Sequence, residues 1–399
     1  MVVGAGMAGA WTAEHLRRAG YTGELTLVGA EPHAPYDRPP LSKAVLEGRT
    51  DSTTLKQLEL SGVETRYGAR ATGLRPGTLE TTDGPIAFDA VALATGAVPI
   101  RLPGSEHARV LRTIDDARSL RERLRPGSRL AIVGAGWIGA EVATAARKRG
   151  VEVIVVEAAA APLAAALGPD VGRLFVPWYA EAGVELRLDS PVQEVVPGGL
   201  VLADGERISA DEVVVGVGVR PDLAWLEGSG VGYERGVLTD EHMAVTWPEA
   251  TAAGIGAVAV GDCAAWWSRR YGARLLVEHW DSAQQAPEVA AATLLGLTGE
   301  DGPAVYDPVP YFWSDQFGRM IQYAGHRAAA VEVVYRGDVT QPKGWSVGWV
   351  DAAGRIVAIM AVGRPVDVVR GRKLLVAGVP IDAERFADPS FALTMPVAS

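Results

Sequence analysis

The stretches Gly4-Ala5-Gly6-Met7-Ala8-Gly9 and Gly134-Ala135-Gly136-Trp137-Ile138-Gly139 are two copies of one glycine-rich loop in a single chain. Each copy follows an apolar run and opens a segment with the composition of a helix. In such a loop the first glycine permits a tight turn, the second admits a pyrophosphate, and the third allows helix and strand to pack closely. The pyrophosphate lies on the helix N-terminus. A plain strand-to-helix turn is the alternative for either copy alone, because the chain contains 47 glycines, but the pair predicts two dinucleotide sites.

Strand-like and helix-like segments alternate around both loops. The first set comprises a short strand Val2-Val3, a helix over 8–19, strands over 25–28, 90–94 and 257–260, and a proline-rich loop over 31–43. The second set follows a linker over 99–104 and comprises strands over 129–133, 151–156 and 211–217 and a helix over 140–149. This alternation predicts an α/β fold with parallel sheets. From about Tyr306 onward, strand and turn signals over 331–335, 345–350 and 356–362 predict a differently built third domain.

Composition and charge narrow the class of protein. A chain of 399 residues with 48% hydrophobic and 22% charged residues is typical of a globular protein of two or three domains. It contains no run of about 18 apolar residues, so we expect no membrane span. The first glycine loop begins at residue 4, which leaves no room for a signal peptide, so we expect a cytoplasmic protein. The net charge of −10 argues against nucleic acid as a partner.

The chain has one cysteine, Cys263, and six histidines. A single cysteine excludes an internal disulfide, a redox pair and a self-contained iron–sulfur cluster. The histidines show no metal-binding spacing, so we expect no metal site. Cys263 itself is interpreted as a small, partly buried residue.

Three acids are candidates for binding nucleotide hydroxyl groups. Glu157 follows Gly139 at close to the spacing of about 20 residues at which an acid binds the ribose of NAD, and four alanines follow it. With no basic residue to hold a 2′-phosphate, NADH is favoured over NADPH. Glu31 is the corresponding candidate after the first loop, with a solvated loop acid as the alternative. Asp262 follows a buried-type strand and is expected to bind a ribose or ribityl hydroxyl, or to act as a helix N-cap.

Glu141 lies two residues after the second loop and is expected in the first helical turn. A carboxylate directed into the phosphate site would be unfavourable, so its side chain must point elsewhere. Compensation of the helix dipole is one explanation. The other is that Glu141 faces the nicotinamide end of the nucleotide, near a flavin.

Three motifs outside the glycine loops resemble those of one family. They are Pro35-Tyr36-Asp37-Arg38-Pro39-Pro40-Leu41-Ser42-Lys43, Glu278-His279-Trp280-Asp281-Ser282-Ala283 and Pro310-Tyr311-Phe312-Trp313-Ser314-Asp315-Gln316. Together with Thr95-Gly96 and Gly261-Asp262, they resemble the signatures of FAD-dependent ferredoxin reductases that serve bacterial cytochrome P450 and dioxygenase systems. The likeness runs in register from residue 1 to about 325. Pro287 follows the second motif at a position where the family usually has a glycine. We expect Pro287 at the start of the next helix.

The resemblance implies a glutathione-reductase-like fold with two Rossmann-like domains and a C-terminal α+β domain. The FAD domain would comprise 1–104 and 223–306, the inserted NAD domain 105–222, and the C-terminal domain 307–399. Lys43, Glu141 and Trp313 would be the catalytic residues beside the flavin. The residues expected to bind FAD are Gly4, Gly6, Met7, Ala8, Gly9, Glu31, Arg38, Lys43, Ala94, Thr95, Gly96, Arg101, Gly261, Asp262, Glu278, His279, Trp280 and Trp313. Those expected to bind NAD are Gly134, Gly136, Trp137, Ile138, Gly139, Glu141, Glu157 and Gly218.

The resemblance also implies a direction of electron flow. A hydride passes from NADH to FAD, with Lys43 stabilising the reduced ring and pairing with Glu141. Without a redox disulfide the electrons leave singly for an external carrier, by resemblance an acidic [2Fe-2S] ferredoxin. Docking it would need a local basic patch. The candidates are Arg269, Arg270, Arg274 and Arg319, and the alternative is that these are exposed arginines that only contact solvent. A monomer or weak dimer is expected.

Other electron acceptors and other flavoprotein classes are alternatives to this one. An NADH oxidase or peroxidase usually needs an active-site cysteine near the first helix, and Cys263 stands elsewhere. A redox-sensing flavoprotein like apoptosis-inducing factor fits less well, because its DNA binding relies on a basic surface. Rubredoxin or another small carrier stays open as the acceptor, whereas a monooxygenase would need a substrate domain that the chain does not show.

Overall fold

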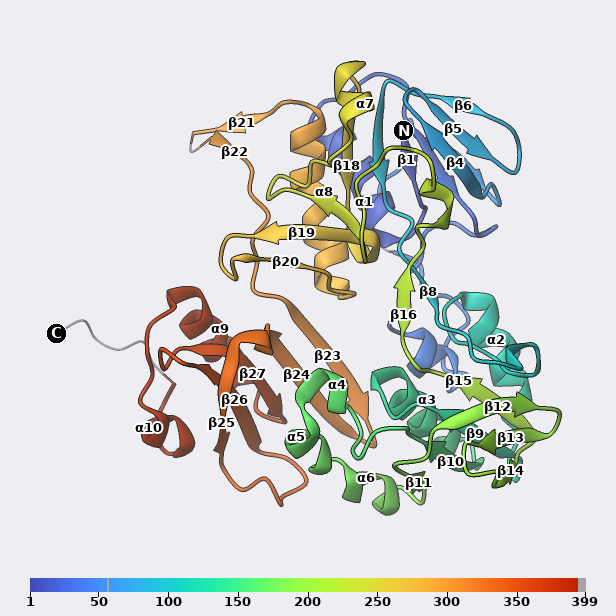
Figure 1. Ribbon diagram of the computed structural model, residues 1–399, viewed down its shortest axis with the longest axis vertical. Coiled ribbons are helices and arrows are strands. Elements are labelled where there is room, and N and C mark those ends of the chain that lie inside the picture. The colour runs from blue at the N-terminus through green and yellow to red at the C-terminus, as the bar shows by residue number, and fades with distance from the viewer. Residues whose placement is uncertain (56, 301, 394–399) are drawn as a thin grey trace. The chain divides into compact units, whose positions relative to one another are not determined.

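The computed structural model describes residues 1–55, 57–300 and 302–393, so residues 394–399 of the expected C-terminal domain lie outside the described part. Two compact units make up the chain, and each is assembled from separated segments (Figure 1). The first unit comprises Met1–Asp37, Ser52–Val98 and Val219–Pro310, and the second comprises Arg38–Asp51, Pro99–Gly218 and Tyr311–Ser399. Within the described ranges, no helix is long and apolar enough to cross a membrane.

The first unit is built on a five-stranded parallel sheet in the order β18-β7-β1-β2-β3. Its strands are β1 (Val2–Val3), β2 (Thr26–Gly29), β3 (Glu64–Tyr67), β7 (Ala90–Leu93) and β18 (Gly256–Ala259). Strand β1 has only two residues, yet it is central and both of its valines are buried. Two helices, α1 (Met7–Arg18) and α8 (Trp280–Leu294), pack against each other in the same unit.

Smaller elements complete the first unit. They are β4 (Ala71–Arg75), β5 (Thr78–Thr81), β6 (Ile86–Ala87), β17 (Val237–Thr239), α7 (Pro248–Ala252), β19 (Ala264–Ser268), β20 (Ala273–Leu275), β21 (Thr298–Gly299), β22 (Gly302–Pro303) and the 3₁₀ turns η3 (Ala224–Leu226) and η4 (Gly261–Cys263). Strand β8 (Ala97–Pro99) pairs with β16 (Val219–Pro221) where the chain passes between units.

The second unit contains a four-stranded parallel sheet in the order β11-β10-β9-β15. Its strands are β9 (Arg129–Val133), β10 (Glu152–Val156), β11 (Glu185–Arg187) and β15 (Glu212–Val215), with helix α3 (Trp137–Lys148) after β9. The other elements of this region are η1 (Leu41–Val45), η2 (Ser105–His107), α2 (Ile114–Arg123), α4 (Ala164–Leu167), α5 (Pro169–Arg173), α6 (Val176–Glu181), β12 (Val192–Val196), β13 (Gly199–Leu202) and β14 (Arg207–Ser209).

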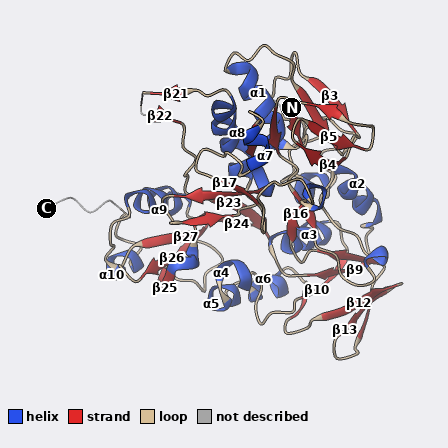
Figure 2. Ribbon diagram, turned by 45° about the horizontal axis from the view of Figure 1, so that its top comes forward, coloured by secondary structure: helices blue, strands red, loops and turns tan. Residues whose placement is uncertain are grey.

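An antiparallel sheet in the order β23-β24-β27-β26-β25 forms the C-terminal part of the second unit (Figure 2). Its strands are β23 (Tyr311–Gln316), β24 (Arg319–Gly325), β25 (Ala330–Arg336), β26 (Trp345–Asp351) and β27 (Ile356–Val362). Helix α9 (Pro365–Ala377) packs on β24 and β27, and α10 (Ala383–Ala387) packs on β25. A further 3₁₀ turn, η5 (Arg327–Ala329), precedes β25.

The structure corrects two expectations about helices. Pro287 does not begin a helix but lies inside α8. Proline has no N–H to donate to the preceding turn, and α8 tolerates it while Ala286, Ala290 and Ala291 of the same helix are buried in the core of the unit. The proline-rich loop also ends earlier than expected, because Leu41 already begins the π-helix η1.

Candidate functional site

The first and third glycines of both loops are fixed by close backbone contacts. A Cβ on Gly4 would lie 2.1 Å from the carbonyl oxygen of Ala94, and one on Gly134 would lie 2.5 Å from that of Gly216. A Cβ on Gly9 would lie 1.8 Å from the Gly4 oxygen, and one on Gly139 would lie 2.1 Å from the Gly134 oxygen. No side chain fits at these distances, so both loops require glycine for the packing of strand against helix.

The second glycine of each loop has a different environment. A Cβ on Gly6 would meet no atom within 4 Å, and one on Gly136 would meet only an oxygen at 4.0 Å. Gly6 and Gly136 are also the N-cap residues of α1 and α3, and neither helix start has a side-chain cap or an acid in its first turn. Open backbone beside uncapped N–H groups suits a pyrophosphate, so both loops fit a dinucleotide.

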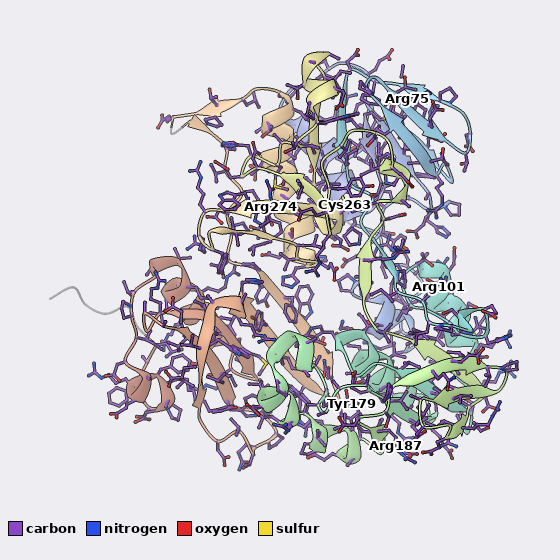
Figure 3. All side chains as sticks on the ribbon, in the orientation of Figure 1. Arg75, Arg101, Tyr179, Arg187, Cys263 and Arg274 are labelled. Atoms are coloured by element: carbon purple, nitrogen blue, oxygen red, sulfur yellow. The ribbon has the colours of Figure 1, made fainter. Side chains whose placement is uncertain are left out.

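The two candidate ribose acids are held differently. Glu157 accepts hydrogen bonds from the backbone N–H of Ala135, at 2.7 Å, and of Ala159, at 2.9 Å, one on each carboxylate oxygen. Because each oxygen has a further lone pair, the carboxylate can still accept ribose hydroxyls. Glu31 instead accepts a bond of 2.5 Å from the Tyr36 hydroxyl. Near Glu157, burial and the charge of that acid raise the pKa of the Tyr179 hydroxyl (Figure 3).

Residues from three segments gather at the ends of β7 and β18 in the first unit. Thr95 donates to the carbonyl of Asp222 at 3.2 Å. Asp262 lies within η4, whose N-cap is Val260, so its alternative role as a helix N-cap is excluded. Cys263 is fully buried rather than partly buried, and burial raises the pKa of its thiol. The thiol is therefore not a candidate nucleophile.

The structure corrects the expected place of Glu141. Helix α3 begins at Trp137, three residues before the expected start, and its first turn contains no acid. Glu141 therefore lies in the second turn, beyond the reach of the dipole effect, which is confined to the first turn. Its carboxylate is 4% exposed. Dipole compensation does not explain a buried acid at this position.

Glu141 is instead the centre of a buried hydrogen-bond cluster. Its Oε2 accepts bonds from Lys43 Nζ at 2.7 Å and from Ser42 Oγ at 2.5 Å. Its Oε1 accepts a bond of 2.6 Å from Ser314 Oγ on β23. The expected pairing of Lys43 with Glu141 is confirmed. Three donors around one carboxyl group suit a carboxylate, which is acceptor-only.

Helix α3 and the C-terminal hairpin meet along one face of each. Trp137 packs edge-on against Phe312 with ring centroids 4.7 Å apart. At the hairpin tip, Phe317 donates its N–H to Thr144 Oγ1 at 2.9 Å, and its ring contacts Tyr179. Trp137, Glu141 and Thr144 share a helix face because they are spaced by four and three residues. Glu141 is therefore joined to the strand that carries Trp313.

Other expected cofactor residues divide between the two units. In the first, Trp280 begins α8 and donates its Nε1 to Asp37 at 2.8 Å, and His279 is the N-cap of that helix. In the second, Arg38 donates to the carbonyl of Arg112 at 2.6 Å, and Arg101 is exposed (Figure 3). Ile138 is 44% exposed at the start of α3, and Gly218 follows β15 with a φ of 115°.

The expected arginine patch is not a set of free charges. Arg269 forms an ion pair with Glu241 at 2.7 Å, and Arg274 donates to the carbonyl of Thr239. Arg319 pairs with Glu181, lies 4.8 Å from the ring of Trp178 and has a side chain only 14% exposed. It also belongs to the second unit, whereas the other three candidates belong to the first. The expectation that Arg319 offers an exposed charge was wrong.

Sequence reasoning did not assign roles to Ser42 and Ser314. Ser42 precedes Lys43 in the first motif, and Ser314 follows Trp313 in the third. Neither position signals a carboxylate partner, because Glu141 is distant from both in the chain.

Known proteins are similar to this chain over most of its length. Residues 1–287 match the family model "Pyridine nucleotide-disulphide oxidoreductase", and residues 311–396 match "Reductase C-terminal". The chain is 37% identical to the chlorobenzene dioxygenase ferredoxin reductase component of Cupriavidus sp. (strain PS12), covering 97% of this chain and 94% of that protein. It is 33% identical to rhodocoxin reductase of Rhodococcus erythropolis, covering 100% and 94%.

Solved structures are similar over the same extent. The crystal structure of Fdr9 matches with a TM-score of 0.93 and 47% identity over 99% of both chains. The reductase in the covalent putidaredoxin reductase–putidaredoxin complex matches with a TM-score of 0.89 and 29% identity over 98% of this chain and 96% of that one. The chain therefore belongs to the pyridine nucleotide-disulphide oxidoreductase family.

Proposed function

We propose that this chain is a FAD-dependent reductase that passes electrons from NADH to a ferredoxin. The observation that carries the proposal is the pair of glycine loops with open, uncapped helix starts, the second of which opens the helix that holds the Lys43–Glu141 ion pair. Relatives that match nearly the whole chain are ferredoxin reductase components of oxygenase systems. The single cysteine excludes an internal disulfide as a carrier.

The second loop binds NADH in this proposal. Gly134, Gly136 and Gly139 form the cradle, and the N–H groups at the start of α3 hold the pyrophosphate. Glu157 accepts the adenosine ribose hydroxyls while its two backbone bonds keep the carboxylate in place. The absence of a basic residue from Ala158 to Ala161 leaves a 2′-phosphate without a partner, so NADH is preferred over NADPH.

The first loop binds FAD through its pyrophosphate in the same way. Gly4, Gly6 and Gly9 form this cradle, with Met7 and Ala8 at the start of α1. Further FAD contacts come from Glu31, Asp262 and the segment 94–96. The proposed domains are 1–104 with 223–306 for FAD, 105–222 for NAD and 307–399 for the C-terminal domain.

FAD held by the first loop would accept a hydride, two electrons and one proton, from NADH; two ferredoxin molecules would then each take up one electron and the proton would be released to solvent. Lys43 is placed beside the flavin in this proposal, where its ammonium group stabilises the negative charge that develops on reduction. Glu141 holds that ammonium group at 2.7 Å. Trp313, on the strand bonded to Glu141 through Ser314, borders the acceptor side.

The carrier is proposed to be a [2Fe-2S] ferredoxin, with the reductase acting in the cytoplasm as a monomer or weak dimer. The test begins with anaerobic reduction of the FAD-loaded protein by NADH and, separately, by NADPH. Cytochrome c reduction is then measured with and without putidaredoxin and other [2Fe-2S] ferredoxins. We expect faster bleaching with NADH and cytochrome c reduction that depends on a ferredoxin.

Rapid oxygen consumption in air with no acceleration by any ferredoxin would contradict the proposal and favour an oxidase. Equal rates with both nucleotides would leave the electron path intact but remove the role given to Glu157.

A further inference from the structure

Ser314, the buried serine of β23, takes part in two side-chain hydrogen bonds. Ser314 is 1% exposed, and its hydroxyl donates to Glu141 Oε1 at 2.6 Å. The neighbouring Gln316, also 1% exposed, donates its Nε2 to Ser314 Oγ at 3.2 Å. Because the serine oxygen accepts from the amide, its single proton is directed at the carboxylate.

Ser314 and Lys43 use different oxygens of the same carboxylate. Lys43 and Ser42 bind Oε2, and both come from η1, while Ser314 binds Oε1 from the C-terminal sheet. The last side-chain torsion of glutamate is broad, so bonds on both oxygens are needed to fix the plane of the carboxyl group. Among the described residues bonded to Glu141, Lys43 is the charged one.

We propose that Ser314 is a positioning residue that sets the strength of the Lys43–Glu141 pair by occupying the second carboxylate oxygen. With Ser314 present, part of the negative charge is stabilised by the serine and the lysine meets one oxygen. Without it, the carboxyl group turns both oxygens toward Lys43, and its charge is compensated mainly by the ammonium group. Lys43 then has less positive charge to offer to the flavin. This inference rests on the proposed function for the place of Lys43.

The test is the midpoint potential of the bound FAD, measured by anaerobic dye-coupled titration of the holoenzyme. We expect Ser314→Ala to shift the equilibrium toward oxidised flavin by about tenfold, which for a two-electron couple is a fall of about 30 mV. Ser314→Thr keeps the hydroxyl and is expected to restore most of the wild-type potential.

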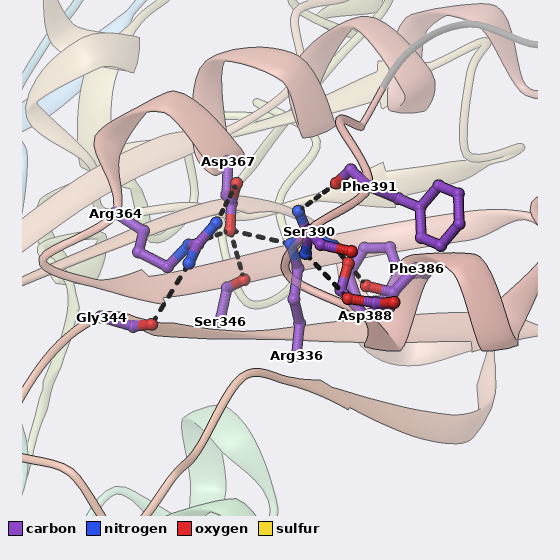
Figure 4. Close-up of polar contacts among 9 residues, drawn as sticks. All are labelled: Arg336, Gly344, Ser346, Arg364, Asp367, Phe386, Asp388, Ser390 and Phe391. Carbon is purple, nitrogen blue, oxygen red and sulfur yellow. Dashed lines mark hydrogen bonds and ion pairs between the residues drawn. The ribbon is translucent and has the colours of Figure 1, made fainter.

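Ser346→Ala is the matched control. Ser346 is also fully buried in the C-terminal sheet and donates its hydroxyl to a carboxylate, Asp367 Oδ2, at 2.9 Å (Figure 4). The two alanine variants lose the same kind of bond and are expected to unfold at similarly lowered temperatures. Only Ser314→Ala is expected to change the flavin potential.

The outcomes separate this inference from the proposed function. If Lys43→Ala lowers the potential and Ser314→Ala leaves it unchanged, the positioning role is wrong while the proposed function stands. If neither variant changes the potential, Lys43 is not beside the flavin, so the inference and the role given to Lys43 both fail, while ferredoxin-dependent cytochrome c reduction still tests the proposed function separately. If Ser346→Ala lowers the potential as much as Ser314→Ala, the effect is general destabilisation, and the inference is overturned.

Discussion

The two glycine loops have nearly the same backbone and different surroundings. Their first and third glycines make the same contacts, and their second glycines are equally open. The helices that follow differ at several matching positions, and at one of them α1 has Trp11 where α3 has Glu141. Trp11 packs near His15 on its own helix, whereas Glu141 binds Ser42, Lys43 and Ser314 from two other segments.

This difference shows that a glycine-rich loop predicts that a nucleotide binds but not which protein groups surround that nucleotide. The glycines follow from the geometry of strand, pyrophosphate and helix, which is common to both sites. The residue two positions after the third glycine determines which other segments the helix contacts there. In this chain the helix after the second loop holds Glu141, which pairs with Lys43, where the helix after the first loop has Trp11.

The strongest test of the comparison replaces the third glycine of each loop. Gly9→Ala and Gly139→Ala both place a methyl group within about 2 Å of a backbone oxygen, at 1.8 and 2.1 Å. We expect Gly9→Ala to lose bound FAD. Gly139→Ala should keep FAD and lower kcat/KM for NADH by about a hundredfold or more, since a displaced cradle misplaces the nucleotide. FAD content and steady-state kinetics measure these effects.

Gly6→Ala and Gly136→Ala are the matched controls, because a Cβ there meets nothing closer than 4.0 Å. They should fold as the wild type and weaken only the binding of their own nucleotide. Loss of FAD from Gly139→Ala would show that the two loops have been assigned the wrong way round.

A second test changes the ion pair attached to the second loop. Lys43→Ala removes the positive charge and should lower the flavin midpoint potential by about 30 mV or more, a tenfold change in equilibrium. Glu141→Gln keeps the shape and leaves Lys43 uncompensated, so the potential should rise by a similar amount. Shifts of the same sign in the two variants would argue that they act through distorted packing rather than charge.

A third test concerns the acids after each loop. Glu157→Ala removes a carboxylate that holds both the loop and, in our proposal, the ribose. Hydrogen bonds to charged groups contribute about 1.5–3 kcal/mol, so kcat/KM for NADH should fall roughly tenfold to a hundredfold, and the preference over NADPH should narrow. Glu152→Ala, at the exposed start of the same strand, is the control. An unchanged NADH to NADPH ratio would remove Glu157 from the site.

The smallest effect is expected where neither loop is touched. In the C-terminal sheet, burial opposes ionisation of Asp367, but bonds from Arg364 and Ser346 and the charge of Arg336 outweigh it and lower its pKa. A lowered pKa in the folded state stabilises the protein above the unfolded value of about 3.9, and this contribution is lost as the pH falls through the folded value.

The free energy of unfolding of wild type should therefore exceed that of Asp367→Asn at pH 7, and the gap should shrink below about pH 4. Chemical denaturation at several pH values measures it. FAD content and NADH kinetics at pH 7 should be unchanged in the variant, and a pH-independent gap would show that the charge of Asp367 is not what stabilises the sheet.

Much of the fold could be predicted because its strands are continuous apolar runs. Strands β1, β9 and β27 have the predicted bounds, and β10 and β25 differ by one residue at their ends. The start of α3 was misplaced because Trp137 and Ile138 belong both to the loop motif and to the helix. The position of Pro287 was mispredicted for another reason. The helix propensity of proline favours the first turn, but α8 packs against α1 and continues through Pro287.

The site was predictable only where chemistry is local. The glycine loops can be recognised from the spacing of their glycines, and the pairing of Lys43 with Glu141 was predicted from the family resemblance. The serines that complete the cluster could not be found, because a hydroxyl has no preferred spacing from its acceptor. Arg319 was misjudged because its charge is visible in the sequence and its partner, Glu181, is not.

The turn between β23 and β24 has a consequence for anyone who wants to exchange modules between such reductases. Phe317 and Gly318 both have positive φ, 50° and 77°, and a left-handed conformation costs a non-glycine residue roughly 1–2 kcal/mol. The chain tolerates this at the residue that bonds Thr144 and packs on Tyr179. A chimera with a foreign C-terminal domain after Pro310 should therefore also take the residues of α3 and α6 that contact this turn. The side-chain contacts of Phe317, and not only the linker, connect the C-terminal sheet to those helices.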